Sequence, residues 1–454
     1  MKNDICDGSV SITDPIALED WNAMIRAFLA HGSQTPTYLA AVLKREPGFA
    51  MGHAARGLFT LMLARRELQD VAAAALKDAE TALSQGHSSL REQLWCRALA
   101  AWLAGRPSGA VALVEEVLVH NPRDTFSAKL SHAIRFMMGD RHGMRRSVER
   151  LLSAHEENHP MRGFLLGCHA FTLEETGEYA RAEQAGLEGL SLAPDDAWGL
   201  HAVAHVYDMT HQPDRGIALI DDNGGSWLHC NNFRYHVWWH KALLHLDRHE
   251  TDHVLALYDN EIRHDRTDDF RDFSNASSLL MRLELEGVDV GGRWEELAEL
   301  AESRSGDACL AFADLHYMLA LVRRGRQDAA QAMLARFHRD SAAPETESLR
   351  ILAEPGLIAA EGLAAYGEGQ YGAAFRNLAL AQPRMQSVGG SHAQRDVFER
   401  ITIDAGMRAG YLAETEALIR KRTAKRGGFE DSFAAIRLQQ LSAARASMHH
   451  VAAP

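Results

Sequence analysis

Two pairs of histidines, each with a spacing of four residues, fall in segments whose apolar pattern is helical. The first pair is His201 and His205 in 201-HAVAHVYDM-209, and the second is His236 and His240 in 236-HVWWH-240. Residues four apart on a helix share one face, with Cβ atoms roughly 5–6 Å apart. Each pair can therefore point two imidazoles at one place.

Imidazoles grouped in this way predict a metal or ligand site. Imidazole binds zinc, iron, copper and nickel, and metal sites often combine three protein ligands with a water. We predict that His201, His205, His236 and His240 hold a divalent transition metal, with zinc and iron as the candidates. Such an ion can support hydrolysis, whereas a histidine beside an aspartate can act as a general base without a metal. The alternative is a set of structural histidines, since neither pair contains the Glu of an H-E-x-x-H motif.

Further side chains with similar chemistry fall at comparable places in other helical segments. Three more histidines are expected to line the same groove: His53, His132 and His316. Four carboxylates are expected nearby: Asp208, Asp259, Asp272 and Asp314.

A second candidate site is the loop-to-helix stretch 388-VGGSHAQRDVFER-400. Its glycine pair can adopt backbone angles closed to other residues, and Ser391 is a good N-cap. Exposed amides at the helix start, with Arg395 just inside, predict a site for a carboxylate or phosphate, with Arg282 as a second anion partner. The alternative is an ordinary capped helix in which Arg395 and Asp396 form structural ion pairs.

The elements that would position these side chains are helices. Apolar residues return every three or four positions in segments such as 108-SGAVALVEEVLVH-120, and strict alternation is rare. We predict an all-α fold with essentially no sheet.

Helical hairpins repeat along the chain. Two triplets with identical internal spacings lie 72 residues apart: Gly105, Ala110 and Pro122, and Gly177, Ala182 and Pro194. The offset is close to two tetratricopeptide units of about 34 residues each. In such a unit Gly ends the first helix, a small Ala lets the second pack closely, and Pro opens the next unit at a first helical turn.

Hairpins of this kind stack into an α-solenoid because none can bury its apolar face alone. The first helix of each hairpin lines the concave groove, which would bring the four histidines together. We predict one continuous tetratricopeptide-like superhelix over residues 16–445, with an N-terminal extension at 1–15 and a tail at 446–454.

Composition narrows the class of protein. The net charge of −13 argues against broad binding to nucleic-acid backbones. Five cysteines are spread singly, which predicts a reduced, cytoplasmic chain without a disulfide framework. The N-terminal stretch MKNDICDGSVSITDP lacks the apolar run of a signal peptide, and no long apolar segment predicts a membrane span.

Several motifs resemble tetratricopeptide repeat protein 38 and its bacterial relatives. Besides the two histidine segments, they are 51-MGHA-54, 91-REQL-94, 286-EGVDVGGRW-294 and 388-VGGSHAQRDVF-398. The resemblance runs over nearly the whole chain and implies a cytosolic helical-repeat protein. It implies little about activity, because the family is defined by its repeats.

These observations predict a cytoplasmic repeat protein that binds a peptide or a small acidic molecule in a histidine-rich concave groove. The alternative function is a metal-assisted or His/Asp-based hydrolase that acts on a small molecule in the same pocket. The candidate ligand-binding residues are His53, His132, His201, His205, His236, His240, Arg282, His316, Arg395 and Asp396. A homo-oligomer is compatible with the sequence, while nucleic acid and membrane are not expected partners.

Overall fold

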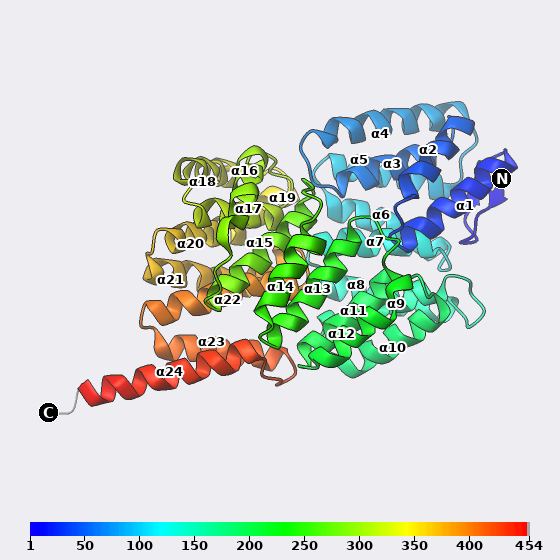
Figure 1. Ribbon diagram of the computed structural model, residues 1–454. Coiled ribbons are helices and arrows are strands. Elements are labelled where there is room, and N and C mark those ends of the chain that lie inside the picture. The colour runs from blue at the N-terminus through cyan, green and yellow to red at the C-terminus, as the bar shows by residue number, and fades with distance from the viewer. Residues whose placement is uncertain (452–454) are drawn as a thin grey trace.

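The chain forms an all-α superhelix preceded by a short hairpin of two strands (Figure 1). The structure is a computed structural model, and it describes residues 1–451, with side chains to residue 447. Strands β1 (Lys2–Asn3) and β2 (Ser9–Val10) pair antiparallel. Cys6 and Val10 of this hairpin are fully buried in the first hydrophobic core, so the N-terminal residues pack on the body of the protein.

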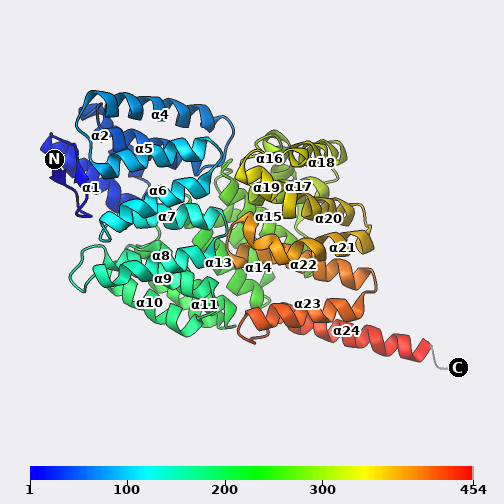
Figure 2. The same ribbon diagram turned by 180° about the vertical axis from the view of Figure 1, so that it is seen from behind.

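The helices form two columns that stand side by side in both views (Figures 1 and 2). The first column comprises α1 (Pro15–Leu29), α2 (Thr35–Arg45), α3 (Ala50–Leu61), α4 (Leu68–Gln85), α5 (Leu90–Leu103), α6 (Pro107–His120), α7 (Thr125–Met137), α8 (Arg141–Leu151), α9 (Arg162–Glu175), α10 (Tyr179–Leu192), α11 (Ala197–Met209) and α12 (Pro213–Asp222). Between the columns lie α13 (Phe233–Asp247) and α14 (Thr251–Leu257).

The second column carries the rest of the chain. Its helices are α15 (Phe270–Leu285), α16 (Trp294–Arg304), α17 (Ala311–Arg323), α18 (Gln327–Ala342), α19 (Glu347–Ile351), α20 (Leu357–Gly367), α21 (Tyr371–Ala381), α22 (His392–Arg408), α23 (Leu412–Lys425) and α24 (Ser432–Val451). Short 3₁₀ or π turns lie at Leu152–Ala154, Gly224–Ser226, Tyr258–Ile262, Gly291–Arg293, Leu352–Gly356 and Gln382–Val388.

Of the three hairpin rules read from the sequence, those for Gly and Ala are confirmed and the one for Pro is not. Glycines in the left-handed region, with φ from +64° to +85°, follow four of the first helices: Gly105, Gly177, Gly325 and Gly369. Ala110 and Ala182 are fully buried in the second helices. Pro122 and Pro194 precede α7 and α11 by three residues, so they open a unit from the loop rather than from the first helical turn.

A seam joins the two columns through partners that are far apart in the sequence. The Ser108 backbone N–H donates to Glu347 Oε2 at 2.9 Å, across 239 residues. The Gln386 side-chain amide donates to the Gly139 carbonyl at 3.0 Å, across 247 residues. The superhelix therefore returns beside itself after one turn.

This closure buries inner helices on all sides. Every residue of α9 from Gly163 to Glu175 is buried, and α15 and α17 are nearly as enclosed. The concave groove is therefore an interior, where polar side chains must find partners inside the protein.

The C-terminal boundary differs from the expected one. Helix α24 continues to Val451, past residue 445 where a tail was predicted, and residues 452–454 of that tail lie outside the described residues. Over residues 1–451, none of the helices combines the length and apolar character needed to cross a bilayer.

Candidate functional site

Helices α11 and α13 carry both histidine pairs into the interior. Asp196 caps α11, because its carboxylate accepts the backbone N–H groups of Trp198 and Gly199. Positions 198, 201, 205 and 208 then share one face of α11, since they are three and four residues apart. Helix α13 is the neighbouring inner helix, and its two histidines meet those of α11.

Four ring nitrogens converge between these helices. The Nε2 atom of His201 lies 2.9 Å from that of His205 and 3.0 Å from that of His236. The Nε2 atoms of His236 and His240 are 3.1 Å apart. One ligand atom from each of the four rings lies within 4.8 Å of the others. The structure thus brings all four metal-ligand candidates to one point.

One ring has a hydrogen bond at its other nitrogen, and a second ring faces a carboxylate there. His236 Nδ1 donates to Asn275 Oδ1 at 3.1 Å, and His205 Nδ1 lies 3.5 Å from Glu174 Oε1. A proton at Nδ1 leaves the Nε2 lone pair pointing into the cluster, as in metal sites whose histidines are held by a carboxylate or an amide.

Three rings of the cluster, His201, His236 and His240, are neutral, and the cluster has too few protons to bond its own nitrogens. Burial, followed by neighbouring imidazoles, lowers the pKa of His201 and His240 well below the usual value and that of His236 to about 3. With the protons of His205 and His236 at Nδ1, two lone pairs face His201 Nε2, which can donate to only one of them.

A cation at the centre would accept all four lone pairs. Zinc–nitrogen bonds of about 2.0–2.1 Å place tetrahedral ligand nitrogens roughly 3.3–3.4 Å apart, close to the separations seen here. The donor set therefore fits a transition metal.

An ion pair continues from the cluster toward α22. His392 Nε2 bonds to Glu174 Oε1, and the His392 ring lies 5.8 Å from the His205 ring. Although burial opposes it, Glu174 and Glu175 raise the pKa of His392 to about 9. Burial alone would raise the pKa of Glu174, but His392 and His205 outweigh this effect and lower it to about 2. The pair is therefore charged at neutral pH.

A cavity of about 500 Å³ lies at the seam, directly beside this pair. Glu174, His392, Arg282 and Asp396 are among its lining residues. With His392 protonated, the nine basic side chains of the lining exceed its eight acidic side chains by one. That near-balance suits a ligand with both charges, or with one acidic group, better than a polyanion.

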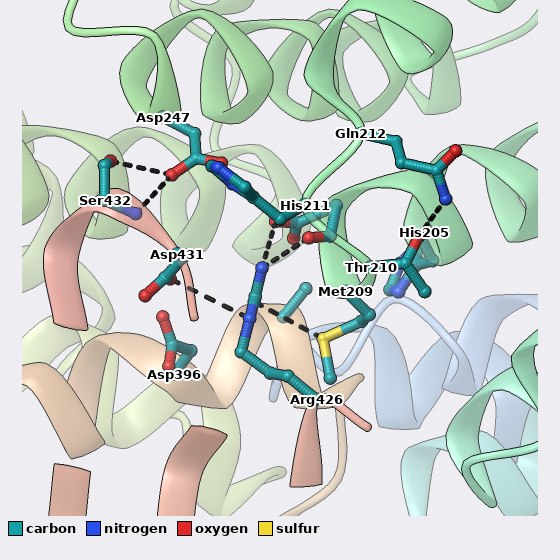
Figure 3. A network of polar contacts seen from close by, with 12 residues as sticks. His205, Met209, Thr210, His211, Gln212, Asp247, Asp396, Arg426, Asp431 and Ser432 are labelled. Atoms are coloured by element: carbon teal, nitrogen blue, oxygen red, sulfur yellow. Dashed lines mark hydrogen bonds and ion pairs between the residues drawn. The ribbon is translucent and has the colours of Figure 1, made fainter. Parts of the chain in front are cut away.

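Figure 3 shows a network of polar contacts in which several residues that line the cavity take part. Arg426, just after α23, donates to the Met209 sulfur at 3.5 Å, and Ser432 Oγ donates to Asp247 at 2.7 Å. Both bonds join the C-terminal helices to α11 or α13, so a ligand in this cavity would contact both columns.

Arg282 carries an incompletely matched charge at the cavity. It is 1% exposed and donates to the carbonyl oxygens of Ser278 and Ala393, while the Asp396 carboxylate lies 3.8 Å away. Burial, and then repulsion from Arg400, lower the pKa of Arg282 to about 9. Asp396 itself is engaged by arginines of α22 and α23, which hold its pKa far below the usual value despite its burial.

The N-terminus of α22 is occupied by a carboxylate of the protein itself. Ser391 caps the helix in a capping box, as its position predicted. The His392 backbone N–H donates to Glu175 Oε1 at 2.7 Å, and Arg395 Nη2 lies 3.5 Å from the other oxygen of Glu175. Glu175 thus occupies the place expected for a carboxylate or phosphate ligand, and Arg395 takes the structural role weighed as the alternative.

Three predicted histidines stay outside the cluster. His53 Nε2 bonds to the Pro47 carbonyl at 2.8 Å, and His316 Nδ1 bonds at 2.8 Å to the carbonyl four residues earlier. Each of these rings serves its local backbone instead of the shared interior. His132 packs against Trp198 at 5.5 Å between ring centroids, and neither of its ring nitrogens has a partner among the described residues.

Sequence reasoning missed Glu174 and His392. Their contact joins residues 218 apart, so no local spacing could reveal it. The signal that existed was 173-LEE-175, two acids at the end of an otherwise apolar inner helix. Among the carboxylates named from the sequence, Asp208 lines the cavity. The others pair elsewhere, with Arg293, Asn232 and Arg336: Asp259, Asp272 and Asp314.

The comparisons with known proteins bear only on the fold. No family model matches the chain. A chain of the APC/C hetero-tetramer Cut9–Hcn1 is 12% identical, with a TM-score of 0.41, and the match covers 94% of this chain and 66% of that one, just under two thirds of its length. The human IFIT1 dimer with PPP-AAAA is 12% identical, with a TM-score of 0.44, and the match covers 96% of each chain. Similarity at this level carries no argument about the site.

Proposed function

We propose that this chain is a metal-binding helical-repeat protein that holds a small acidic molecule or a peptide end in the cavity beside its four-histidine centre. The observation that carries the proposal is the convergence of the four Nε2 atoms. The resemblance of its motifs to tetratricopeptide repeat protein 38 supports a repeat protein of that kind. All five cysteines are free, which supports a reducing, cytoplasmic location.

Each part of the site has a separate task in this proposal. His201, His205, His236 and His240 hold the ion, while Glu174 and Asn275 fix the rings of His205 and His236. The ion supplies a Lewis acid in a water-poor interior. Arg282, whose charge is incompletely matched, receives the acidic group of the ligand.

The hypothesis is tested by metal content and by substitution of the ligands. We expect one divalent metal ion per chain in the purified protein and nearly none in the double variant His205→Gln/His240→Gln. Helicity should persist, because both substitutions keep a polar side chain of similar length on the same helices. Elemental mass spectrometry and circular dichroism measure the two quantities.

The matched control is His316→Gln, which alters a buried histidine outside the cluster and should leave the metal content unchanged. A wild-type chain that folds but takes up no zinc or iron on reconstitution contradicts the proposal. So does a double variant that retains its metal. If the double variant unfolds while His316→Gln remains folded, the four rings are structural residues of the core.

The second candidate is a metal-assisted hydrolase, which the Glu174–His392 pair favours. This charged pair stands between the four histidines and the cavity, where it could hold or move a proton. Four protein ligands complete a tetrahedral zinc site, whereas a six-coordinate ion such as iron keeps open positions. Zinc in the elemental analysis therefore favours binding alone, and iron favours catalysis.

A further inference from the structure

Unpartnered polar atoms gather around Trp198, one helical turn before His201 on α11. The Lys129 ammonium lies 4.7 Å from the Trp198 ring centroid. The His132, His31 and His201 ring centroids lie 5.5, 5.7 and 5.0 Å from it. Six buried nitrogens of these five side chains have no hydrogen-bond partner among the described residues. Native interiors leave only a few such groups per hundred residues, so six around one ring call for an explanation.

Lys129 is the costliest of these groups. It is 4% exposed, and its Nζ atom is one of the unpartnered nitrogens. A buried ammonium without a counter-charge is strongly unfavourable. Asp196 acts on it electrostatically, but the Asp196 oxygens accept backbone N–H groups of α11, and burial raises the pKa of Asp196 to about 7. That carboxyl is therefore only partly ionised at neutral pH and balances Lys129 incompletely.

Lys129 and Trp198 bring donors and no acceptors to this group, whereas each neutral imidazole can donate from one ring nitrogen and accept at the other. The Lys129 ammonium offers three N–H donors, the Trp198 indole offers one, and a neutral His132 ring offers one. None of these donors is used within the described part of the chain. A partner for Lys129 and Trp198 must therefore supply acceptor atoms, and negative charge on it would balance the ammonium.

We propose that Lys129, His132 and Trp198 form an interior binding site for a small oxyanion, a carboxylate or an inorganic phosphate. A bidentate anion would accept from the ammonium and the indole N–H while it neutralises the buried charge. None of these three residues lines the 500 Å³ cavity, so the two sites are distinct.

The oxyanion site and the metal centre lie on the same face of α11. Trp198, His201, His205 and Asp208 follow one another at helical spacing, from the anion site through the four histidines to the cavity. The oxyanion site does not rest on the metal, because Lys129 and His132 need a partner whether or not an ion is bound.

The test compares wild type with Lys129→Met after dialysis into a buffer without carboxylate or phosphate. Acetate and inorganic phosphate are then titrated at constant ionic strength, and the melting temperature and the binding heat are recorded. We expect one anion per chain in the wild type and a saturable rise in Tm of about 1–3 °C. Lys129→Met should bind at least roughly thirtyfold more weakly. In anion-free buffer its Tm should match or exceed that of wild type, because the unpaired charge is gone.

Lys241→Met is the matched control. Lys241 also lies over a tryptophan, 5.2 Å from the Trp238 centroid, but it has its own carboxylate, Asp221, at 2.6 Å. It should keep the full anion response. If only acetate or only phosphate gives the response, the site is supported and its ligand class is identified.

Three results overturn the proposal. An equal Tm rise in wild type and Lys129→Met marks a general salt effect. No response to either probe in wild type means that ordered water alone fills the site. If Lys129→Met fails to fold, Trp198→Phe takes its place, because it removes one donor and keeps the ring, and an unchanged anion affinity in that variant overturns the proposal.

Discussion

At the residue scale, His205 belongs to two groups at once. Its Nε2 atom joins the four converging nitrogens, and its Nδ1 atom faces Glu174, which is paired with His392. The ring therefore connects the metal-ligand candidates to a charged pair at the cavity. Only the Glu174 carboxylate lies between His392 and His205, so a change in the charge of His392 would alter the electrostatic environment of the cluster.

Asp196 makes a pH dependence testable at the same scale. Burial is the main reason that its pKa is about 7 rather than 3.8, with Asp195 adding to the rise and Lys129 opposing it. Between these pH values the folded state holds a proton that the unfolded state has released, so this residue lowers stability as pH rises from about 4 to 7. Asp196→Asn should remove that slope, because asparagine also caps helices but does not titrate.

Urea unfolding at pH 4, 5, 6, 7 and 8 measures the slope for Asp196→Asn. The free energy of unfolding of the variant should equal or exceed that of wild type at pH 8. A variant with the wild-type slope would show that Asp196 titrates normally in the folded protein.

At the scale of elements, buried arginines tie the last helices together. Arg422 of α23 bonds to Asp396 of α22 through Nε at 2.6 Å and to Asp431, just before α24, through Nη2 at 2.6 Å. Arg422 is 2% exposed, so these bonds are shielded from water. The three helices therefore form one unit at the end of the second column.

Arg422→Met should destabilise the protein by about 3–5 kcal/mol, because it removes the arginine that bonds to two buried carboxylates at once. Arg420→Met is the control on the same helix. The side chain of Arg420 is 67% exposed and pairs with Glu416, so its loss should change stability by less than about 0.5 kcal/mol. Equal effects in chemical denaturation would contradict the structural role of Arg422.

The sequence predicted what depends on local spacing. Gly105 and Gly177 marked hairpin turns, and the two histidine pairs marked neighbouring inner helices whose rings meet. It did not predict the engagement of Arg395 by Glu175, because those residues are 220 positions apart and meet only across the seam. Periodicity reports which face of a helix is buried, but not which distant helix covers it.

At the scale of the molecule, the seam converts a groove into an interior. Besides the bonds at Ser108 and Gln386, the Tyr179 hydroxyl donates to the Lys425 carbonyl at 2.6 Å, across 246 residues. The seam thus joins α6 to α19 and, lower in Figure 1, α10 to the end of α23. It encloses the four histidines and forms the walls of the cavity.

Gly139→Ala should weaken this seam. Gly139 has a φ of +68°, and a Cβ atom there would collide with the backbone carbonyl of Gln386. Gly177→Ala is the matched control, since Gly177 has a φ of +85° and nothing within 4 Å of an added Cβ. Backbone strain should lower the free energy of unfolding of both variants by about 1–2 kcal/mol. The collision with Gln386 should lower that of Gly139→Ala by about 1–3 kcal/mol more.

Small-angle X-ray scattering should show a larger radius of gyration for Gly139→Ala than for Gly177→Ala. Limited proteolysis should cut the inner helices of Gly139→Ala sooner. Identical profiles for the two variants would mean that the columns do not depend on this contact.

The closed turn also constrains how the chain can change length. In an open solenoid each repeat contacts only its neighbours, so a repeat can be gained or lost at small cost. Here the bonds from Ser108, Gly139 and Tyr179 reach partners 239, 247 and 246 residues away. One added or deleted hairpin between these partners would put every one of them out of register together, so the number of repeats within the turn is fixed by the same contacts that shut it.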